Sequence, residues 1–182
     1  MTDSRSLRDQ YRAEKSALLA SLASSGTSTR GVKATLGKLS VLADGMLQAL
    51  WQQAGFTAPF ALVAVGGFGR GELFPYSDVD VLVLLPDDQS PDKDAQLKAR
   101  IEGFIGSCWD TGLEIGSSVR TLTECLDEAS RDVTIQTSLI ESRLITGNAD
   151  LFTRFQKAFF SAIDPKAFFV AKTLELRQRH NK

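Results

Sequence analysis

Apolar residues recur at helical spacing through the first third of the chain. They fall every three or four positions over residues 7–22 and again over residues 32–50, a period that gathers them on one face of a helix. The sequence therefore predicts two amphipathic helices. The polar run Ser24–Ser28 predicts the break between them. Gly55 predicts the end of the second helix, because glycine favours the position just after a helix C-terminus.

From residue 58 the pattern changes to short apolar runs without a helical period. Residues 60–65 and 81–85 are continuous apolar segments bounded by glycine or proline. Both are too short for a helix and are typical of buried strands. A third strand is predicted over residues 113–120, where apolar and polar positions alternate. Because side chains alternate along a strand, Glu114 and Gly116 would share its polar face.

Helical signals return around and after the third strand. A helix is predicted over residues 91–109 from its composition. Three more are predicted to begin at residues whose side chains cap a first turn: Asp132, Asn148, and Asp164, which stands before Pro165. The sequence therefore places helices on both flanks of the predicted strands.

These elements predict an α/β (α+β) fold, a small mixed sheet with N-terminal and C-terminal flanking helices. We divide the chain into an N-terminal helical segment (1–57), a core (58–147) and the start of a truncated helical domain (148–182). The hydrophobic fraction of 43% and charged fraction of 24% are typical of a soluble globular protein. No apolar run approaches the roughly 20 residues of a membrane span, and the polar N-terminus is unlike a secretory signal. We expect a cytoplasmic protein with no membrane partner.

Charge, cysteine and histidine counts narrow the chemistry. A formal net charge of −1 argues against extended nucleic-acid binding, which usually needs a basic face. The two cysteines, Cys108 and Cys125, are too few for a disulfide framework. The single histidine, His180, excludes a histidine metal cage and a Ser-His-Asp triad. Any metal site must then use carboxylates, which favours Mg²⁺ or Mn²⁺.

Candidate chemistry concentrates in the segment VGGFGRGELFPYSDVDVLVLL, residues 65–85. Residues two apart on a strand face the same side, so Asp78 and Asp80 would stand about 6–7 Å apart at Cα. Two carboxylates this close repel each other unless a cation lies between them, and a hard divalent ion meets that need. The pair therefore predicts a metal site.

Gly66 and Gly67 supply the other half of the candidate site. They follow a predicted buried strand, and without side chains they let backbone N–H groups approach phosphate oxygens. Arg70 could contact the same phosphates, or could pair with Glu72 or an aspartate to hold the loop. Ser77 could bond to phosphate or to backbone. The glycine spacing fits neither a P-loop nor a G-x-G-x-x-G fingerprint, and its combination with Asp-x-Asp predicts a site that binds phosphate groups and a metal ion.

A third carboxylate would complete a two-metal site for displacement at phosphorus. Glu114 is the first candidate, because it lies on the polar face of a strand expected beside the one that carries Asp80. Asp110 is the competitor, in a predicted turn. The alternative is that Glu114 is only a polar residue of its strand.

Gly-Gly followed by Asp-x-Asp is the signature of the DNA polymerase β-like nucleotidyltransferase fold. Residues 65–85 closely resemble the N-terminal catalytic domain of the bacterial PII uridylyltransferase/uridylyl-removing enzyme family. The later segments GLEIGSSVRTLTEC, DVTIQTSLIESRLITGN and AKTLELRQRH are similar to it too. By this resemblance, Asp78 and Asp80 match the family's metal-binding pair, and Gly66 and Gly67 match its phosphate-binding turn.

The resemblance implies transfer of UMP from UTP to a tyrosine hydroxyl of the PII signal protein, which links glutamine status to nitrogen assimilation. The nucleophile would then belong to PII. Enzymes of this family are several times longer, with a hydrolase domain that removes UMP and ACT domains that sense glutamine. Those domains are expected for the full-length enzyme and are not in this sequence. The family's catalytic region also continues past the final helix of this sequence, so we expect the isolated fragment to be weak or inactive because its helical wall is incomplete.

Two alternatives stay open. The glycine and aspartate motifs contact phosphates and metal rather than the base, so an adenylyltransferase or another small nucleotidyltransferase would share them. The other alternative is a catalytically inactive module that binds nucleotide or a partner protein. Such a module would have little use for two clustered carboxylates.

Overall fold

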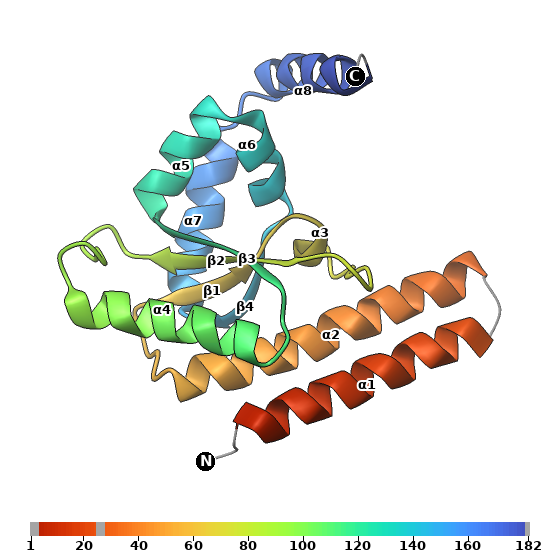
Figure 1. Cartoon of the computed structure of the whole chain (residues 1–182). Helices are drawn as coiled ribbons and strands as arrows, with labels where there is room; N and C mark the ends of the chain where they lie inside the picture. Colours follow the sequence, from red (N-terminus) through yellow and green to blue (C-terminus); the bar gives the residue numbers. More distant parts are fainter. Residues whose placement is uncertain (1–3, 25–27, 181–182) are drawn as a thin grey trace.

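The computed structural model describes residues 4–24 and 28–180, in which helices cover both faces of a four-stranded mixed sheet (Figure 1). The strands are β1 (Ala61–Ala64), β2 (Val79–Leu85), β3 (Ile115–Thr121) and β4 (Arg143–Gly147), in the spatial order β3-β2-β1-β4. β2 pairs in parallel with β3, whereas β1 pairs antiparallel with β2 and with β4. The predicted fold class is confirmed.

The helices begin largely where the sequence predicts them. They are α1 (Ser4–Ser24), α2 (Thr29–Gln53), α3 (Gly66–Gly69), α4 (Ala95–Asp110), α5 (Leu122–Arg131), α6 (Val133–Ile140), α7 (Ala149–Ala162) and α8 (Pro165–His180). The side chains of Asp132, Asn148 and Asp164 each accept hydrogen bonds from backbone N–H groups two or three residues later. All three predicted caps are therefore confirmed, because each satisfies N–H groups that the first helical turn leaves unpaired.

Two apolar clusters form the core, one on each face of the sheet. α1, α2 and α4 cover one face, and α5, α6 and α7 cover the other (Figure 1). Alternation along β2 sends Val81 and Val83 into the first cluster and Leu82 and Leu84 into the second. Because both faces are covered, β2 is apolar at every position except Asp80.

The predicted stripe of α2 packs on the sheet. Leu39 and Leu47 are fully buried, and Trp51 stacks on Phe56 with ring centroids 3.9 Å apart. The predicted end of this helix is confirmed, since Gly55 has a φ of 71°, the left-handed conformation that follows many helices. The predicted break at residues 24–28 lies mostly outside the described residues.

Several elements differ from the sequence-based prediction, among them the short helices α3 and α5, which the sequence did not predict. The helix expected from residue 91 begins at Ala95, because the Asp94 carboxylate accepts hydrogen bonds from two N–H groups and so caps it there. β4 was not predicted at all. It is a five-residue edge strand that begins with Arg143 and holds only two aliphatic residues, so it lacks the apolar run that marks β1 and β2.

The last two helices have different surroundings. α7 buries Phe155 and Phe159 in the second cluster, so it shares a core with the sheet. α8 lies at the end of the molecule opposite α1 (Figure 1) and leaves Phe169 70% exposed. The division at residues 57 and 147 stays a prediction. No helix in the described part of the chain is long and apolar enough to cross a membrane.

Candidate active site

The end of β1 and the start of β2 lie side by side and carry the candidate site. The Val65 N–H donates to the Asp80 carbonyl over 3.1 Å, which closes the antiparallel pair at this end. The chain between them forms α3 and then a loop through Ser77. This places Asp80 beside Gly66: a Cβ on that glycine would lie 3.8 Å from Oδ2 of Asp80. The glycine turn and the second aspartate of the sequence motif therefore lie close together.

The glycine pair forms the first turn of α3. Gly66 has a φ of 58°, which glycine adopts without strain. The first hydrogen bond of this turn runs from the Gly69 N–H to the Val65 carbonyl over 3.1 Å. The N–H groups of Gly66, Gly67 and Phe68 precede that bond, so the helix does not use them. Helix hydrogen bonding therefore leaves them available to a ligand, and the phosphate-binding role of this turn stays a prediction.

The Asp80 carboxylate fills a gap between three elements. Asp80 pairs with Gly116 across β2 and β3, and a Cβ on Gly116 would lie 2.4 Å from Oδ1 of Asp80. The hydroxyl of Ser138 from α6 is also close to the glycine turn, 3.5 Å from where a Cβ of Gly66 would stand. Gly116 therefore leaves the room that this carboxylate occupies, whereas a Cβ on Gly66 would only touch it.

Asp78 lies in the loop just before β2, which begins at Val79. The expectation that both aspartates share one face of a strand is therefore wrong, because pairing with β3 starts only at Val79. The two carboxylates nevertheless interact. The pKa of Asp80 is raised, first because surrounding protein atoms remove part of its hydration and second because the charge of Asp78 repels it.

A pair of mutually repelling carboxylates suits a hard divalent cation. Mg²⁺ in proteins is usually bound by one or two carboxylates, with phosphates and waters completing the shell. Within residues 4–24 and 28–180, no group of three or more Asp, Glu, His or Cys side chains is arranged to hold a metal. The donor set that fits Mg²⁺ or Mn²⁺ is therefore Asp78 with Asp80, to which a bound triphosphate would add oxygens.

Glu114 is not gathered with the two aspartates. It precedes β3, which begins at Ile115, and lines a cavity of about 90 Å³ together with Tyr11 of α1 and Ser77. The pKa of Tyr11 is raised by burial and also by the charge of Glu114. The other candidate, Asp110, is the exposed last residue of α4. A metal-binding role for Glu114 stays a prediction.

Arg70 is held by two carboxylates on the protein. Its guanidinium pairs with Glu141, and its Nε lies 3.8 Å from the Glu72 carboxylate. These partners raise the pKa of Arg70, chiefly through the hydrogen bond to Glu141. Of the two alternatives from the sequence, the pairing that holds the loop is the one formed. Ser77 donates its N–H to the Phe74 carbonyl over 3.2 Å, and its side chain is exposed. Contact of either residue with phosphate stays a prediction.

Three residues near the site were missed by sequence reasoning: Ser138, Glu141 and Arg143. They lie on α6, just after it and at the start of β4. No recognised motif contains them, and the only signal was that the surrounding segment 132–148 resembles the same family. The fold brings them to α3 because α6 packs on α3 and β4 pairs with β1.

Comparison with known proteins agrees with this geometry. Residues 47–140 match the family described as nucleotidyltransferase domain, a range that includes the glycine turn and both aspartates. The chain belongs to the nucleotidyltransferase domain family. Within that family match lie β1, β2 and β3, so the elements that place Asp80 are those of a nucleotidyltransferase domain.

Relatives of this nucleotidyltransferase domain are named bifunctional uridylyltransferase/uridylyl-removing enzymes. The one from Burkholderia orbicola (strain AU 1054) is 58% identical over 151 residues, which is 83% of this chain and 17% of the relative. The one from Burkholderia mallei (strain SAVP1) is 53% identical over 177 residues, which is 97% of this chain and 20% of the relative. The chain thus spans about a fifth of the length of the relatives it matches.

Proposed function

We propose that this domain transfers UMP from UTP to a tyrosine hydroxyl of the PII signal protein, as part of nitrogen regulation. One observation carries the chemistry: the Asp80 carboxylate is held between Gly66 and Gly116, close enough to Asp78 for that charge to raise its pKa. The choice of UTP is supported by the uridylyltransferase relatives, which match nearly the whole chain.

Each part of the site has a separate task in this proposal. The N–H groups of Gly66, Gly67 and Phe68 bind triphosphate oxygens, while Asp78 and Asp80 hold Mg²⁺ or Mn²⁺. When bound, such an ion offsets the negative charge on the phosphoryl group under attack. The acceptor tyrosine comes from PII, so this chain orients the reactants and supplies no nucleophile.

Nucleotide binding tests the first half of the proposal. Without a cation, two carboxylates repel a triphosphate, so binding should require Mg²⁺. We expect calorimetric titration of UTP, ATP, GTP and CTP to show a Mg²⁺-dependent preference for UTP. Equal binding of all four nucleotides would contradict the choice of the uracil base by this domain, while the metal dependence would still support nucleotidyl transfer.

Transfer of label from [α-³²P]UTP to purified PII tests the second half. We expect the double variant Asp78→Asn with Asp80→Asn to lower the transfer rate about a hundredfold or more, since the charge that holds the cation is lost. Asp92→Asn, at an exposed position before α4, is the matched control and should leave the rate unchanged. The same substitutions are made in an intact relative, because this chain spans only about a fifth of the length of its relatives. An unchanged rate in the double variant would show that the carboxylate pair is not the metal site.

A further inference from the structure

Arg143 of β4 is bonded to the turn that carries the glycine pair, 74 residues away in the sequence. Its Nη2 donates to the Phe68 carbonyl and its Nε donates to the Gly69 carbonyl, each over 3.3 Å. These carbonyls stand at the C-terminal end of α3, where the Phe68 carbonyl also accepts from the Gly71 N–H over 3.0 Å. Arg143 therefore adds side-chain donors at the far end of the same turn whose first N–H groups are the candidate phosphate donors.

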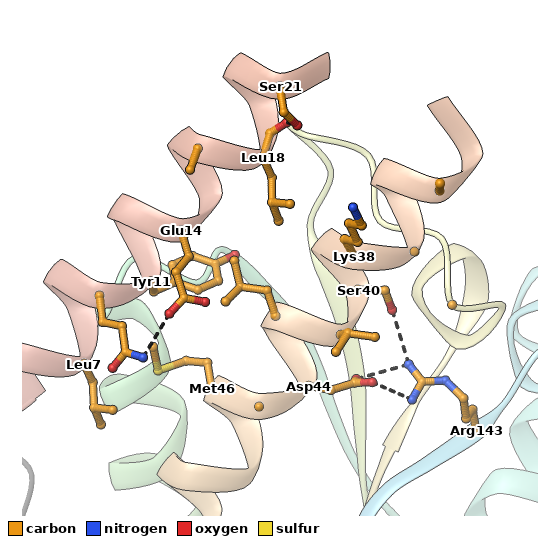
Figure 2. Close-up of a pocket in the computed structure, with 18 residues that line it drawn as sticks. Leu7, Tyr11, Glu14, Leu18, Ser21, Lys38, Ser40, Asp44, Met46 and Arg143 are labelled. Atoms are coloured by element: carbon orange, nitrogen blue, oxygen red, sulfur yellow. Dashed lines mark hydrogen bonds and ion pairs between the residues drawn. The ribbon is translucent and has the colours of Figure 1, made fainter. Parts of the chain in front are cut away.

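The Arg143 guanidinium is itself oriented from α2. Its Nη1 and Nη2 lie 2.8 Å and 3.1 Å from the two carboxylate oxygens of Asp44, a fork that fixes the plane of the group. Nη2 also donates to the Ser40 hydroxyl over 3.5 Å. Figure 2 shows both partners reaching the guanidinium from α2. The positive group lies over the Phe68 ring as well, 5.5 Å from its centroid.

The chain just before Arg143 closes the remaining side of α3. A Cβ on Gly69 would lie 1.8 Å from the Glu141 carbonyl oxygen, so backbone packs directly on backbone here. The Glu141 side chain pairs with Arg70, which follows α3. A single helical turn is unstable alone, because it fixes several residues for very few hydrogen bonds. The conformation of α3 therefore depends on the segment 141–143.

We propose that Arg143 is a positioning residue: it holds α3 so that the N–H groups of Gly66, Gly67 and Phe68 keep the orientation that phosphate binding requires. Asp44 acts indirectly, because it orients the Arg143 guanidinium. The inference rests on the proposed function in so far as a triphosphate is the ligand of that turn. It adds a connection from α2 through β4 to the phosphate site that the motif itself does not contain.

Arg143→Lys tests this inference with little change in charge. Lysine keeps a positive group near Asp44 but cannot reach that carboxylate and both carbonyls at once, because an ammonium lacks the planar fork. We expect the affinity for Mg²⁺–UTP to fall about tenfold, as for the loss of one to two hydrogen bonds. In transfer assays KM for UTP should rise more than kcat falls. Arg154→Lys, at an exposed arginine of α7, is the matched control.

A second measurement does not depend on nucleotide. Selective ¹⁵N labelling of the 14 glycines lets their amide resonances be followed in each variant. In Arg143→Lys, the resonances of Gly66, Gly67 and Gly69 should shift, whereas those of Gly103 and Gly106 on α4 should not. Should Arg143→Lys fail to fold, Asp44→Asn is measured in the same way, since it leaves the arginine in place.

The two readouts separate this inference from the proposed function. Wild-type affinity for Mg²⁺–UTP in Arg143→Lys, or unshifted resonances of the α3 glycines, would overturn the positioning role. If the wild-type chain bound no nucleotide, the proposed function would fail. The glycine resonances alone would then decide whether Arg143 positions the turn.

Discussion

Gly116 of β3 stands opposite Asp80 of β2, so close that a Cβ on the glycine would lie 2.4 Å from Oδ1 of the aspartate. The carboxylate occupies the space that a side chain at position 116 would fill. Gly116 is not among the glycines with positive φ, so its backbone conformation is open to other residues. Glycine is required there by the position of the Asp80 side chain.

Gly116→Ala should separate activity from stability. The clash meets the end of a flexible side chain, so Asp80 can turn away with a loss of unfolding free energy within about 1 kcal/mol. The displaced carboxylate should weaken Mg²⁺-dependent nucleotide binding about tenfold or more, measured by calorimetry beside urea denaturation. Gly106→Ala, where a Cβ meets nothing within 4 Å, is the control and should stabilise α4 by about 0.5–1 kcal/mol. Normal binding by Gly116→Ala would show that the gap does not position Asp80.

Gly69→Ala should mainly lower the stability of the fold, whereas Gly67→Ala should mainly weaken UTP binding. A Cβ at position 69 would meet backbone atoms of Glu141 at 1.8 Å and 2.8 Å, which cannot move without displacing β4. We expect a loss of about 2–4 kcal/mol in unfolding free energy by urea denaturation. At position 67 the nearest atoms lie 3.6 Å and 3.9 Å away, so stability should change by less than about 1 kcal/mol. There the added methyl should instead obstruct phosphate, seen as weaker UTP binding. Equal stability losses in the two variants would contradict this account.

Asp80→Asn should stabilise the protein at neutral pH. The pKa of Asp80 is raised by burial and by Asp78, so its ionised form is less favourable in the folded than in the unfolded state. The stability it contributes therefore falls as pH rises from the ordinary carboxyl range through the raised pKa. We expect a gain of about 0.5 kcal/mol at pH 7, after allowing for solvent screening. The gain should vanish at a pH where the group is protonated in both states.

Urea denaturation of wild type and Asp80→Asn, each with and without Mg²⁺–UTP, checks whether Asp80 takes part in ligand binding. Wild type should gain stability from Mg²⁺–UTP, and the variant should not, because a ligand stabilises only the state that binds it. Asp92→Asn serves as the control again. Destabilisation by Asp80→Asn at pH 7 without Mg²⁺ would mean that favourable contacts outweigh the repulsion from Asp78.

Both thiols should be inert in the folded protein. Cys108 and Cys125 are unpaired and fully buried, and burial raises the pKa of each to about 12. Ellman's reagent at pH 8 should label neither within minutes in buffer and both in guanidinium chloride, because the thiolate is the reacting form. Val41→Cys, at a position that is 70% exposed, should label at once. Rapid labelling of the unmodified protein would contradict the burial.

Local signals in the sequence were sufficient to predict most of the fold and to name the central candidates of the site. α2, α6, α7 and α8 were predicted from apolar period and caps, which act within a few residues and so can be read from neighbouring positions. Gly66, Gly67 and Asp80 were named as candidates from the Gly-Gly and Asp-x-Asp motif, and the structure places Asp80 beside Gly66. Strand, turn and strand follow one another directly in this segment, so sequence proximity brings these residues together.

Only the tertiary structure decided what surrounds that motif. Asp78 fell outside β2 because the strand begins where pairing with β3 begins, and Glu114 came to lie against α1 rather than beside Asp80. Arg143 reached α3 across 74 residues, held by α2 on one side and β4 on the other. Contacts between elements so far apart follow from how apolar faces pack together. No local period or capping residue specifies that packing, so the residues that support the site appear only once the chain is folded.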